Sequence, residues 1–189
     1  GTILECPDVF EIDGRHVLIS SPLGLLSGTD YPENQSTMQL LSFDAENGSM
    51  RLEGKQSFLD YGMDLYAPQS CLDEKGRRCV IAWVRMPVPQ PAQDNEAADG
   101  RPWSGMMCLP RVVTLRNGHI YTSVHPKVRE YFAGSSVVKM PEGYAECTRD
   151  GRSRVTARIH EGKEIELAGV YIELRDGRVC TYRGKRVPK

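Results

Sequence analysis

The chain has 189 residues, enough for one medium-sized domain or for one domain and part of a second. Hydrophobic residues make up 40% of it and charged residues 26%, as in ordinary globular proteins. Its formal net charge of -1 does not favour binding to nucleic acid or to an anionic membrane, and no apolar run approaches the roughly 20 residues that span a bilayer.

Short β-rich runs follow one another along the first two thirds of the chain. They are HVLIS (16–20), STMQLLSFD (36–44), SCLD (70–73), CVIAWV (79–84) and MMCLPRVVTLRNGHIYTSV (106–124). Turn signals separate them at Asp13-Gly14, Glu46-Asn47-Gly48, Lys75-Gly76 and Asn117-Gly118. Asn117-Gly118 predicts a β-hairpin, because a type I′ turn needs positive φ at both central residues. We therefore predict an all-β fold, either a sandwich, a barrel or a propeller.

The remaining segments differ in composition and in predicted secondary structure. Residues 87–100 (PVPQPAQDNEAADG) predict a long exposed loop, which either rims a binding site or is a plain linker. A turn of helix near 127–132 is the only helical signal. Further β signals between 135 and 189 predict a second all-β unit, and the basic tail 183–189 is expected to be a frayed end.

The six cysteines are scattered, with no Cys-x-x-Cys pair and no histidine at zinc-finger spacing, so no metal site is predicted. Cys71 and Cys79 flank a turn and are expected to face each other across a hairpin, either as a disulfide or, in the preferred interpretation, as two small packed residues. Unpaired thiols favour a reducing, cytoplasmic compartment.

The string Glu5-Cys6-Pro7-Asp8 places a carboxyl group beside a stiff Cys-Pro unit. Cleavage of a glycosidic bond needs a proton donor for the leaving oxygen and a second carboxylate on the far side of the sugar. Glu5 is either that proton donor or a solvated surface charge. Cys6 is interpreted as a packing or hydrogen-bonding residue and not as a thiol nucleophile, because no histidine lies near it in the sequence.

A second polar segment, DYGMDLYAPQS (60–70), brings together Asp60, Asp64, Tyr66 and Gln69. Carboxylates and amides bind sugar hydroxyls, and aromatic faces cover sugar C–H groups, so this mixture suits a polyol pocket. The alternative is a loop that enters a strand, with turn acids and a core tyrosine.

Three residues further along have two interpretations each. Trp83 and Trp103 are either core residues or platforms for a sugar. Arg111 either pairs with a buried acid or caps a strand.

Taken in order, these motifs resemble the C-terminal half of glycoside hydrolase family 32, which contains invertases, fructanases and sucrose-6-phosphate hydrolases. The acid/base Glu-Cys-Pro-Asp motif is matched by Glu5, Cys6, Pro7 and Asp8. A second family segment is matched by Asp60, Gly62, Asp64, Tyr66, Ala67, Pro68 and Gln69, with Leu65 in an aromatic place. Ala82-Trp83 and Leu109-Pro110-Arg111 also match. The resemblance covers about residues 3–132 and is looser over 133–189.

The resemblance implies a five-bladed β-propeller followed by a β-sandwich. Residues 1–126 would then form about three C-terminal blades of the propeller, 127–134 a linker, and 135–189 part of the sandwich. It also implies a retaining double-displacement hydrolysis of terminal β-D-fructofuranosides, with no cofactor and no metal. The preferred fructoside is left open, since most of the pocket rim is either 87–102 or outside this chain.

By the same resemblance, Glu5 is the catalytic acid/base. Asp64, Tyr66 and Trp83 would bind the substrate, supported by Cys6, Asp8, Asp60 and Gln69. The family's nucleophile lies in a Trp-x-Asn-Asp-Pro-Asn-Gly motif and a second aspartate in Arg-Asp-Pro, and neither motif occurs in these 189 residues.

We therefore expect a cut edge near Gly1, a missing N-terminal half of the propeller as partner, and no activity from this chain alone. Two alternatives are a propeller that binds fructosides without cleaving them and a structural interaction protein on a β scaffold.

Overall fold

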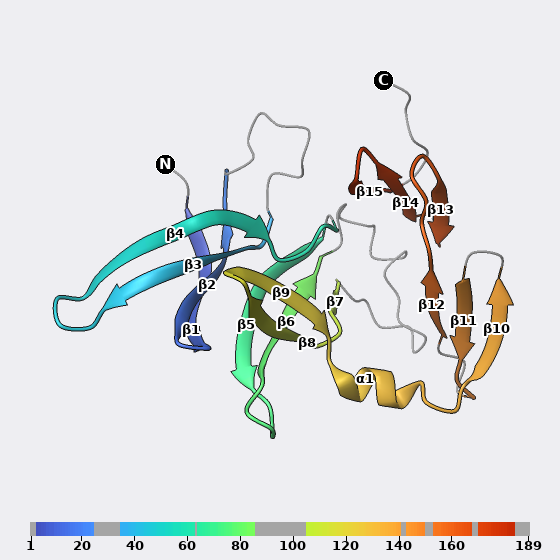
Figure 1. Ribbon diagram of the computed structural model, residues 1–189, viewed down its shortest axis with the longest axis horizontal. Helices are drawn as coiled ribbons and strands as arrows, with labels where there is room; N and C mark the ends of the chain where they lie inside the picture. The colour runs from blue at the N-terminus through green and yellow to red at the C-terminus, as the bar shows by residue number, and fades with distance from the viewer. Residues whose placement is uncertain are drawn as a thin grey trace. The chain divides into compact units, whose positions relative to one another are not determined.

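The computed structural model describes residues 3–24, 35–62, 64–85, 105–140, 143–149, 153–167 and 170–183. Within these ranges the chain forms strands β1 to β15 and one six-residue helix, α1 (Figure 1). Every strand ladder is antiparallel, which confirms the predicted all-β class. The chain divides into two compact units, Gly1–His125 and Pro126–Lys189.

The first sheet of unit 1, called sheet A, is a meander in which neighbours in sequence are neighbours in space. It consists of β1 (Leu4–Ile12), β2 (Arg15–Pro22), β3 (Thr37–Asp44) and β4 (Ser49–Phe58), in that order. Asp13 and Gly14, between β1 and β2, have φ values of 50° and 71°, as a tight hairpin requires. Four strands in sequence order are typical of one propeller blade.

The second sheet, called sheet B, repeats this arrangement. It consists of β5 (Leu65–Leu72), β6 (Arg78–Val84), β8 (Arg111–Arg116) and β9 (His119–Val124), and the short β7 (Met106–Met107) pairs with β6. Asn117 and Gly118 have φ values of 51° and 72°, so the predicted hairpin is confirmed. The described residues of unit 1 thus supply two such sheets, and the count of about three blades stays a prediction.

The core of unit 1 lies between the two sheets. Side chains alternate between the faces of a strand, and one face of each sheet supplies the buried set. That set is Phe10, Val17, Ile19, Met38 and Leu40 from sheet A with Leu59, Leu65, Val80, Ala82, Val113 and Ile120 from or next to sheet B.

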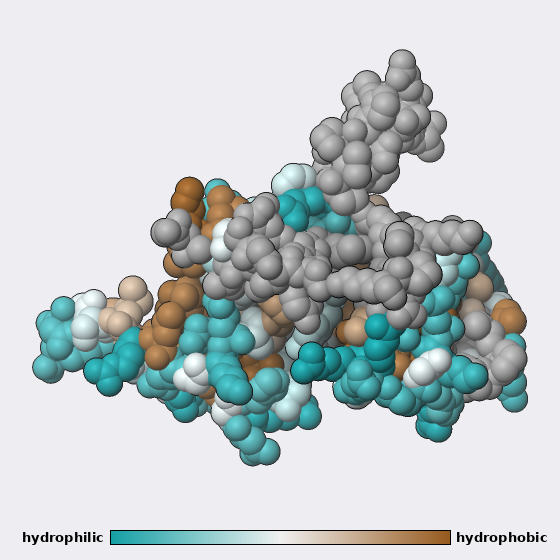
Figure 2. All heavy atoms as spheres, turned by 90° about the horizontal axis from the view of Figure 1, so that it is seen from above, coloured by the Kyte–Doolittle hydropathy of each residue, from teal (hydrophilic) through white to brown (hydrophobic). Residues whose placement is uncertain are grey.

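The opposite face of sheet A also carries hydrophobic side chains. Val9, Phe43, Met50 and Leu52, which we call the outer face of sheet A, are between 44% and 65% exposed. The register of the ladders places them on the face that points away from the core. Figure 2 shows hydrophobic residues gathered on the part of the molecule that sheet A forms.

Sequence reasoning missed two strands of this unit, β1 and β4. Pro7 argues against an ordinary strand, but it lies where the register of β1 shifts between Glu5 and Asp8, and proline is tolerated at such bulges. β4 is largely polar and exposed, so it lacks the alternation by which strands are recognised.

Unit 2 begins with α1 (Pro126–Tyr131), which overlaps the predicted helical turn. Two three-stranded sheets follow: β10 (Ser136–Met140), β11 (Gly143–Cys147) and β12 (Ser153–Ala157), then β13 (Glu164–Leu167), β14 (Val170–Arg175) and β15 (Arg178–Arg183). The assignment of the units to propeller and sandwich stays a prediction.

Some predictions fall on residues that the structure does not describe. These are the loop 87–100, Trp103 and most of the basic tail, 184–189. In the described part of the chain, no helix has the length and apolar character needed to cross a membrane.

Candidate active site

Glu5 lies on β1, the edge strand of sheet A, immediately before a bulge. Cys6 has a φ of 49°, in the left-handed region, and the pairing of β1 with β2 shifts between Glu5 and Asp8. A bulge bends its strand and changes the direction of the neighbouring side chains. The Cys6-Pro7 unit therefore directs Glu5 away from the regular alternation of the strand.

β5, an edge strand of sheet B, has a bulge of the same kind. Ala67 has a φ of 49°, and the pairing of β5 with β6 shifts between Tyr66 and Gln69. Pro68 follows Ala67 just as Pro7 follows Cys6. Each of the two edge strands thus has a polar residue, a left-handed residue and a proline in succession.

Hydrogen bonds join the two bulged strands. The Tyr66 hydroxyl donates to Oε2 of Glu5, across 61 residues of sequence. The Ser70 backbone N–H donates to Oδ2 of Asp8 at 2.7 Å. The residues on either side of the Cys6-Pro7 bulge are therefore held by β5, so the position of Glu5 depends on both sheets.

A chain of buried hydroxyl groups runs beside this contact. The Ala67 N–H donates to Oγ of Ser21 at 3.1 Å, the two hydroxyls of Ser21 and Ser36 are 3.1 Å apart, and Ser36 donates to the carbonyl of Leu65 at 3.1 Å. Each hydroxyl has a single proton, so Ser21 must donate to Ser36. Every member of the chain is satisfied, as buried polar groups need to be.

Burial and the neighbouring carboxylate control the ionisation of Tyr66. Desolvation, the hydrogen bond to Glu5 and the negative charge of Glu5 raise the pKa of Tyr66 to about 12. The guanidinium carbon of Arg85 lies 4.5 Å from the centre of the Tyr66 ring. Tyr66 is therefore a neutral hydrogen-bond donor throughout the physiological pH range.

The structure brings two of the three predicted substrate residues to neighbouring positions. Tyr66 is 9% exposed and lies opposite Trp83 in the β5–β6 register, whereas Trp83 is 38% exposed. Asp64, just before β5, is 7% exposed, and its carbonyl accepts from the Arg85 N–H at 2.9 Å. Their contact with a sugar stays a prediction.

Among the supporting residues, Asp60 is held by an ion pair. Its carboxylate lies 2.6 Å from Nη2 of Arg111 and accepts from the Gly62 N–H at 2.7 Å. Of the two interpretations of Arg111, the structure shows pairing with an acid, but Asp60 is half-buried and not buried as predicted. Gln69 is exposed, and its amide donates to the carbonyl of Pro68 at 2.9 Å.

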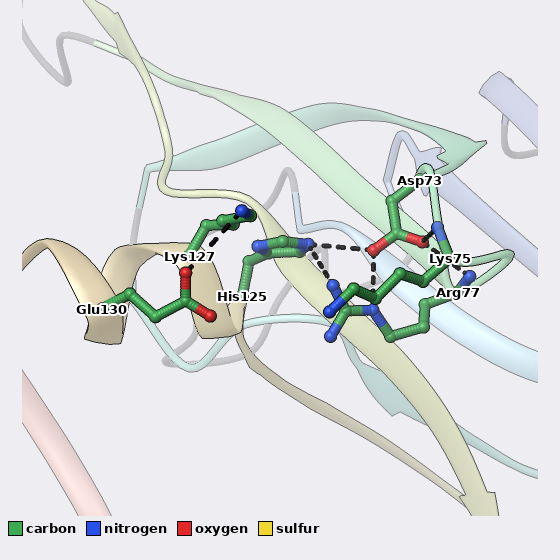
Figure 3. Close-up of polar contacts among 6 residues, drawn as sticks. All are labelled: Asp73, Lys75, Arg77, His125, Lys127 and Glu130. Carbon is green, nitrogen blue, oxygen red and sulfur yellow. Dashed lines mark hydrogen bonds and ion pairs between the residues drawn. The ribbon is translucent and has the colours of Figure 1, made fainter.

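Sequence reasoning missed a second polar cluster, formed by Asp73, Arg77 and His125 (Figure 3). The Asp73 carboxylate accepts from the N–H groups of Lys75 and Arg77, from Nε of Arg77 at 2.6 Å, and from Nε2 of His125 at 3.1 Å. Desolvation acts to raise the pKa of Asp73, but the hydrogen bonds from Arg77 and His125 outweigh it and hold that pKa well below its usual range. The only sequence signal was the turn around Gly76.

Asp73, His125 and Cys79 place their potential metal-ligand atoms within 4.8 Å of one another. However, the Arg77 guanidinium already binds Asp73, and its Nη2 lies 3.1 Å from Nε2 of His125. The Asp73 carboxylate is therefore already paired with a cation, and we assign the cluster a structural role.

The cysteines on the β5–β6 hairpin lie opposite each other, as predicted. Cys71 pairs with Cys79 in the register, and both thiols are free. Cys71 is exposed, whereas burial raises the pKa of the Cys79 thiol.

Comparisons with known proteins agree with this architecture. The model of the glycosyl hydrolases family 32 N-terminal domain matches residues 1–126. A sucrose-6-phosphate hydrolase of Vibrio alginolyticus is 38% identical over 134 residues, covering 68% of this chain and 26% of that protein. Another, of Staphylococcus xylosus, is 30% identical over 171 residues, covering 88% and 31%.

Among solved structures, the Bombyx mori GH32 beta-fructofuranosidase BmSUC1 superimposes with a TM-score of 0.62 at 22% identity, covering 98% of this chain and 43% of that one. The chain thus spans less than a third of the length of the two curated relatives. Because the family model covers two thirds of the sequence, including both bulged strands, the chain belongs to glycoside hydrolase family 32, a family of sucrose and fructoside hydrolases.

Proposed function

We propose that the complete protein hydrolyses terminal β-D-fructofuranosides, such as sucrose, sucrose 6-phosphate or fructo-oligosaccharides, by a retaining double displacement. This chain contributes the acid/base half of the active site. Family membership supports the reaction class, and the names of the curated relatives support sucrose 6-phosphate among the substrates.

The observation that carries the proposal is the fixed carboxyl group of Glu5. One oxygen, Oε2, is bound by Tyr66, and no described residue hydrogen-bonds Oε1. In the first step Oε1 gives its proton to the leaving glycosidic oxygen, and in the second the same oxygen takes a proton from the attacking water.

The nucleophile comes from outside these 189 residues, since neither the Asn-Asp-Pro-Asn nor the Arg-Asp-Pro motif occurs in them. Asp8 does not replace it, because its carboxylate already accepts from the Ser70 N–H. This chain alone is therefore inactive, and its partner is the N-terminal half of the propeller.

The remaining parts of the proposal follow from this assignment. Asp64, Tyr66 and Trp83 form the wall of the fructose pocket. Residues 1–126 belong to the propeller and 135–189 to the sandwich. In the complete protein, a preceding blade covers the outer face of sheet A, and two carboxyl groups and water suffice for the chemistry.

The test compares Glu5→Gln with Glu46→Gln in the full-length protein. Glu46 is an exposed carboxylate in the turn between β3 and β4, and it serves as the control. We expect Glu5→Gln to lower kcat/KM for sucrose by about 10²–10⁴-fold, since general acid–base catalysis contributes that much, while Glu46→Gln stays near the wild type. Fructose release is measured by a coupled hexose assay.

Two results would contradict the proposal: full activity of Glu5→Gln, or fructose release by the polypeptide 1–189 alone. Binding of fructosides without any release by the full-length protein would favour the alternative, a non-catalytic binding propeller.

A further inference from the structure

We propose that Tyr66 is a positioning residue for Glu5: its hydroxyl holds Oε2 of the carboxyl group and leaves Oε1 as the oxygen that exchanges a proton with the sugar. This inference rests on the proposed acid/base role of Glu5. Tyr66 would then do more than line the pocket. A residue of sheet B would orient the carboxyl group of sheet A that transfers the proton.

Three features fix the Tyr66 hydroxyl in space. The left-handed Ala67 and Pro68 set the backbone direction directly after it. Arg85 lies against its ring, at 4.5 Å from guanidinium carbon to ring centre. Only 9% of the residue is exposed, so water does not compete freely for the hydroxyl. A donor that is already oriented costs little reorganisation when charge develops on its partner.

The direction of the hydrogen bond decides what it does to Glu5. The hydroxyl has one proton, which it uses to donate a hydrogen bond to Oε2. A donor binds a carboxylate more strongly than a neutral carboxyl group, so Tyr66 favours Glu5 after its proton has moved from Oε1 to the glycosidic oxygen. Tyr66 keeps its own proton throughout, in agreement with its raised pKa.

The test uses the full-length protein with Tyr66→Phe, which removes only the hydroxyl, and Tyr121→Phe as the matched control. Tyr121 is exposed on β9 and has no place in the proposed site. The first readout is the ¹³C NMR titration of the Glu5 carboxyl carbon, which is identified by its loss in Glu5→Gln. We expect Tyr66→Phe to move this titration to higher pH, because the carboxylate loses a donor, and Tyr121→Phe to leave it unchanged.

The second readout is the pH profile of kcat/KM. The basic limb reports deprotonation of the general acid, so it moves to higher pH in Tyr66→Phe. We expect kcat/KM for sucrose to fall about tenfold at neutral pH, since a hydrogen bond to a charged group is lost. For a fructoside with an aryl leaving group, the fall in kcat/KM is smaller, because that group departs with little protonation.

A second variant distinguishes the loss of the hydrogen bond from a packing defect. Replacing Tyr66 with 3-fluorotyrosine keeps the ring and the hydrogen bond but makes the hydroxyl a stronger donor, so the Glu5 titration moves downward instead. Opposite shifts of the Glu5 titration in the two variants support the proposal. A Glu5 titration that is the same in both variants as in the wild type overturns it. If the titration responds but the wild-type protein releases no fructose, the proposed function fails and the pairing of Tyr66 with Glu5 stands.

Discussion

Cys6 and Ala67 have left-handed backbones although neither is a glycine. An L-residue in that region costs about 1–2 kcal/mol, because its Cβ approaches the following carbonyl oxygen. Each directly follows one partner of the Glu5–Tyr66 hydrogen bond. Strain held next to a candidate catalytic group is expected where the surrounding structure fixes that group in position.

At position 67, a β-branched side chain tests this strain. We expect Ala67→Val to lower the free energy of unfolding by about 1–3 kcal/mol, because valine tolerates positive φ less well than alanine. The measurement is urea denaturation of the full-length protein. Thr122→Val, at a regular strand position on β9, is the control and should change little. Equal stability of the two variants would contradict a strained Ala67.

Sequence reasoning identified Glu5, Tyr66 and Asp8 but not how they combine. The Glu5–Tyr66 contact joins residues 61 positions apart, and it depends on the packing of two sheets. Asp60 was expected to support the site, which stays a prediction, and its ion pair with Arg111 across 51 positions was not foreseen. Such long-range pairs leave no local pattern in a single sequence.

Among the elements, the β5–β6 hairpin shows how a turn is secured by more than its own residues. Asp73, at the turn, is bound by the backbone of Lys75 and Arg77, by the Arg77 side chain, and by His125 from the end of β9. The turn was predictable from Gly76, which has a φ of 72°. Its link to His125 was not, because it joins residues 52 positions apart.

Asp73→Asn tests the electrostatic part of this link. The hydrogen bonds depress the pKa of Asp73 in the folded protein, so its carboxylate contributes stability that is present above the unfolded-state pKa and is lost as the pH falls through the folded-state pKa. We expect Asp73→Asn to lower the melting temperature at pH 7 and to have a progressively smaller effect below pH ~4.

Differential scanning calorimetry of the full-length protein between pH 3 and pH 7 gives the comparison. Asp13→Asn, at an exposed turn position that also tolerates asparagine, is the control. A loss of stability in Asp73→Asn that is the same at every pH would show that packing, and not charge, is responsible.

At the scale of the whole molecule, the outer face of sheet A is an apolar surface that stays exposed among the residues that the structure describes. Val9, Phe43, Met50 and Leu52 lie on one face, and three of them cluster on the β3–β4 hairpin. An apolar sheet face normally packs against another layer. The curated relatives are more than three times the length of the matched segment.

The polypeptide 1–189 should therefore self-associate. We expect Met50→Lys combined with Leu52→Lys to weaken this association about tenfold or more, since each side chain removed from an apolar contact is worth about 1.5–3 kcal/mol. Leu72→Lys, which changes an exposed leucine of sheet B, is the control. Association is measured by sedimentation velocity. A wild-type polypeptide that is monomeric would contradict self-association through the outer face of sheet A.

The meander order of both sheets has a consequence for the order of folding. Each sheet pairs strands that are neighbours in sequence, so its contacts are local and form quickly. The Glu5–Tyr66 hydrogen bond joins the two sheets, so we expect it to form when they dock. Residue 66 leaves the ribosome after the whole of sheet A, so during synthesis the acid/base group is placed in a late event. We expect refolding experiments to show β-structure by circular dichroism before the Tyr66 environment becomes native.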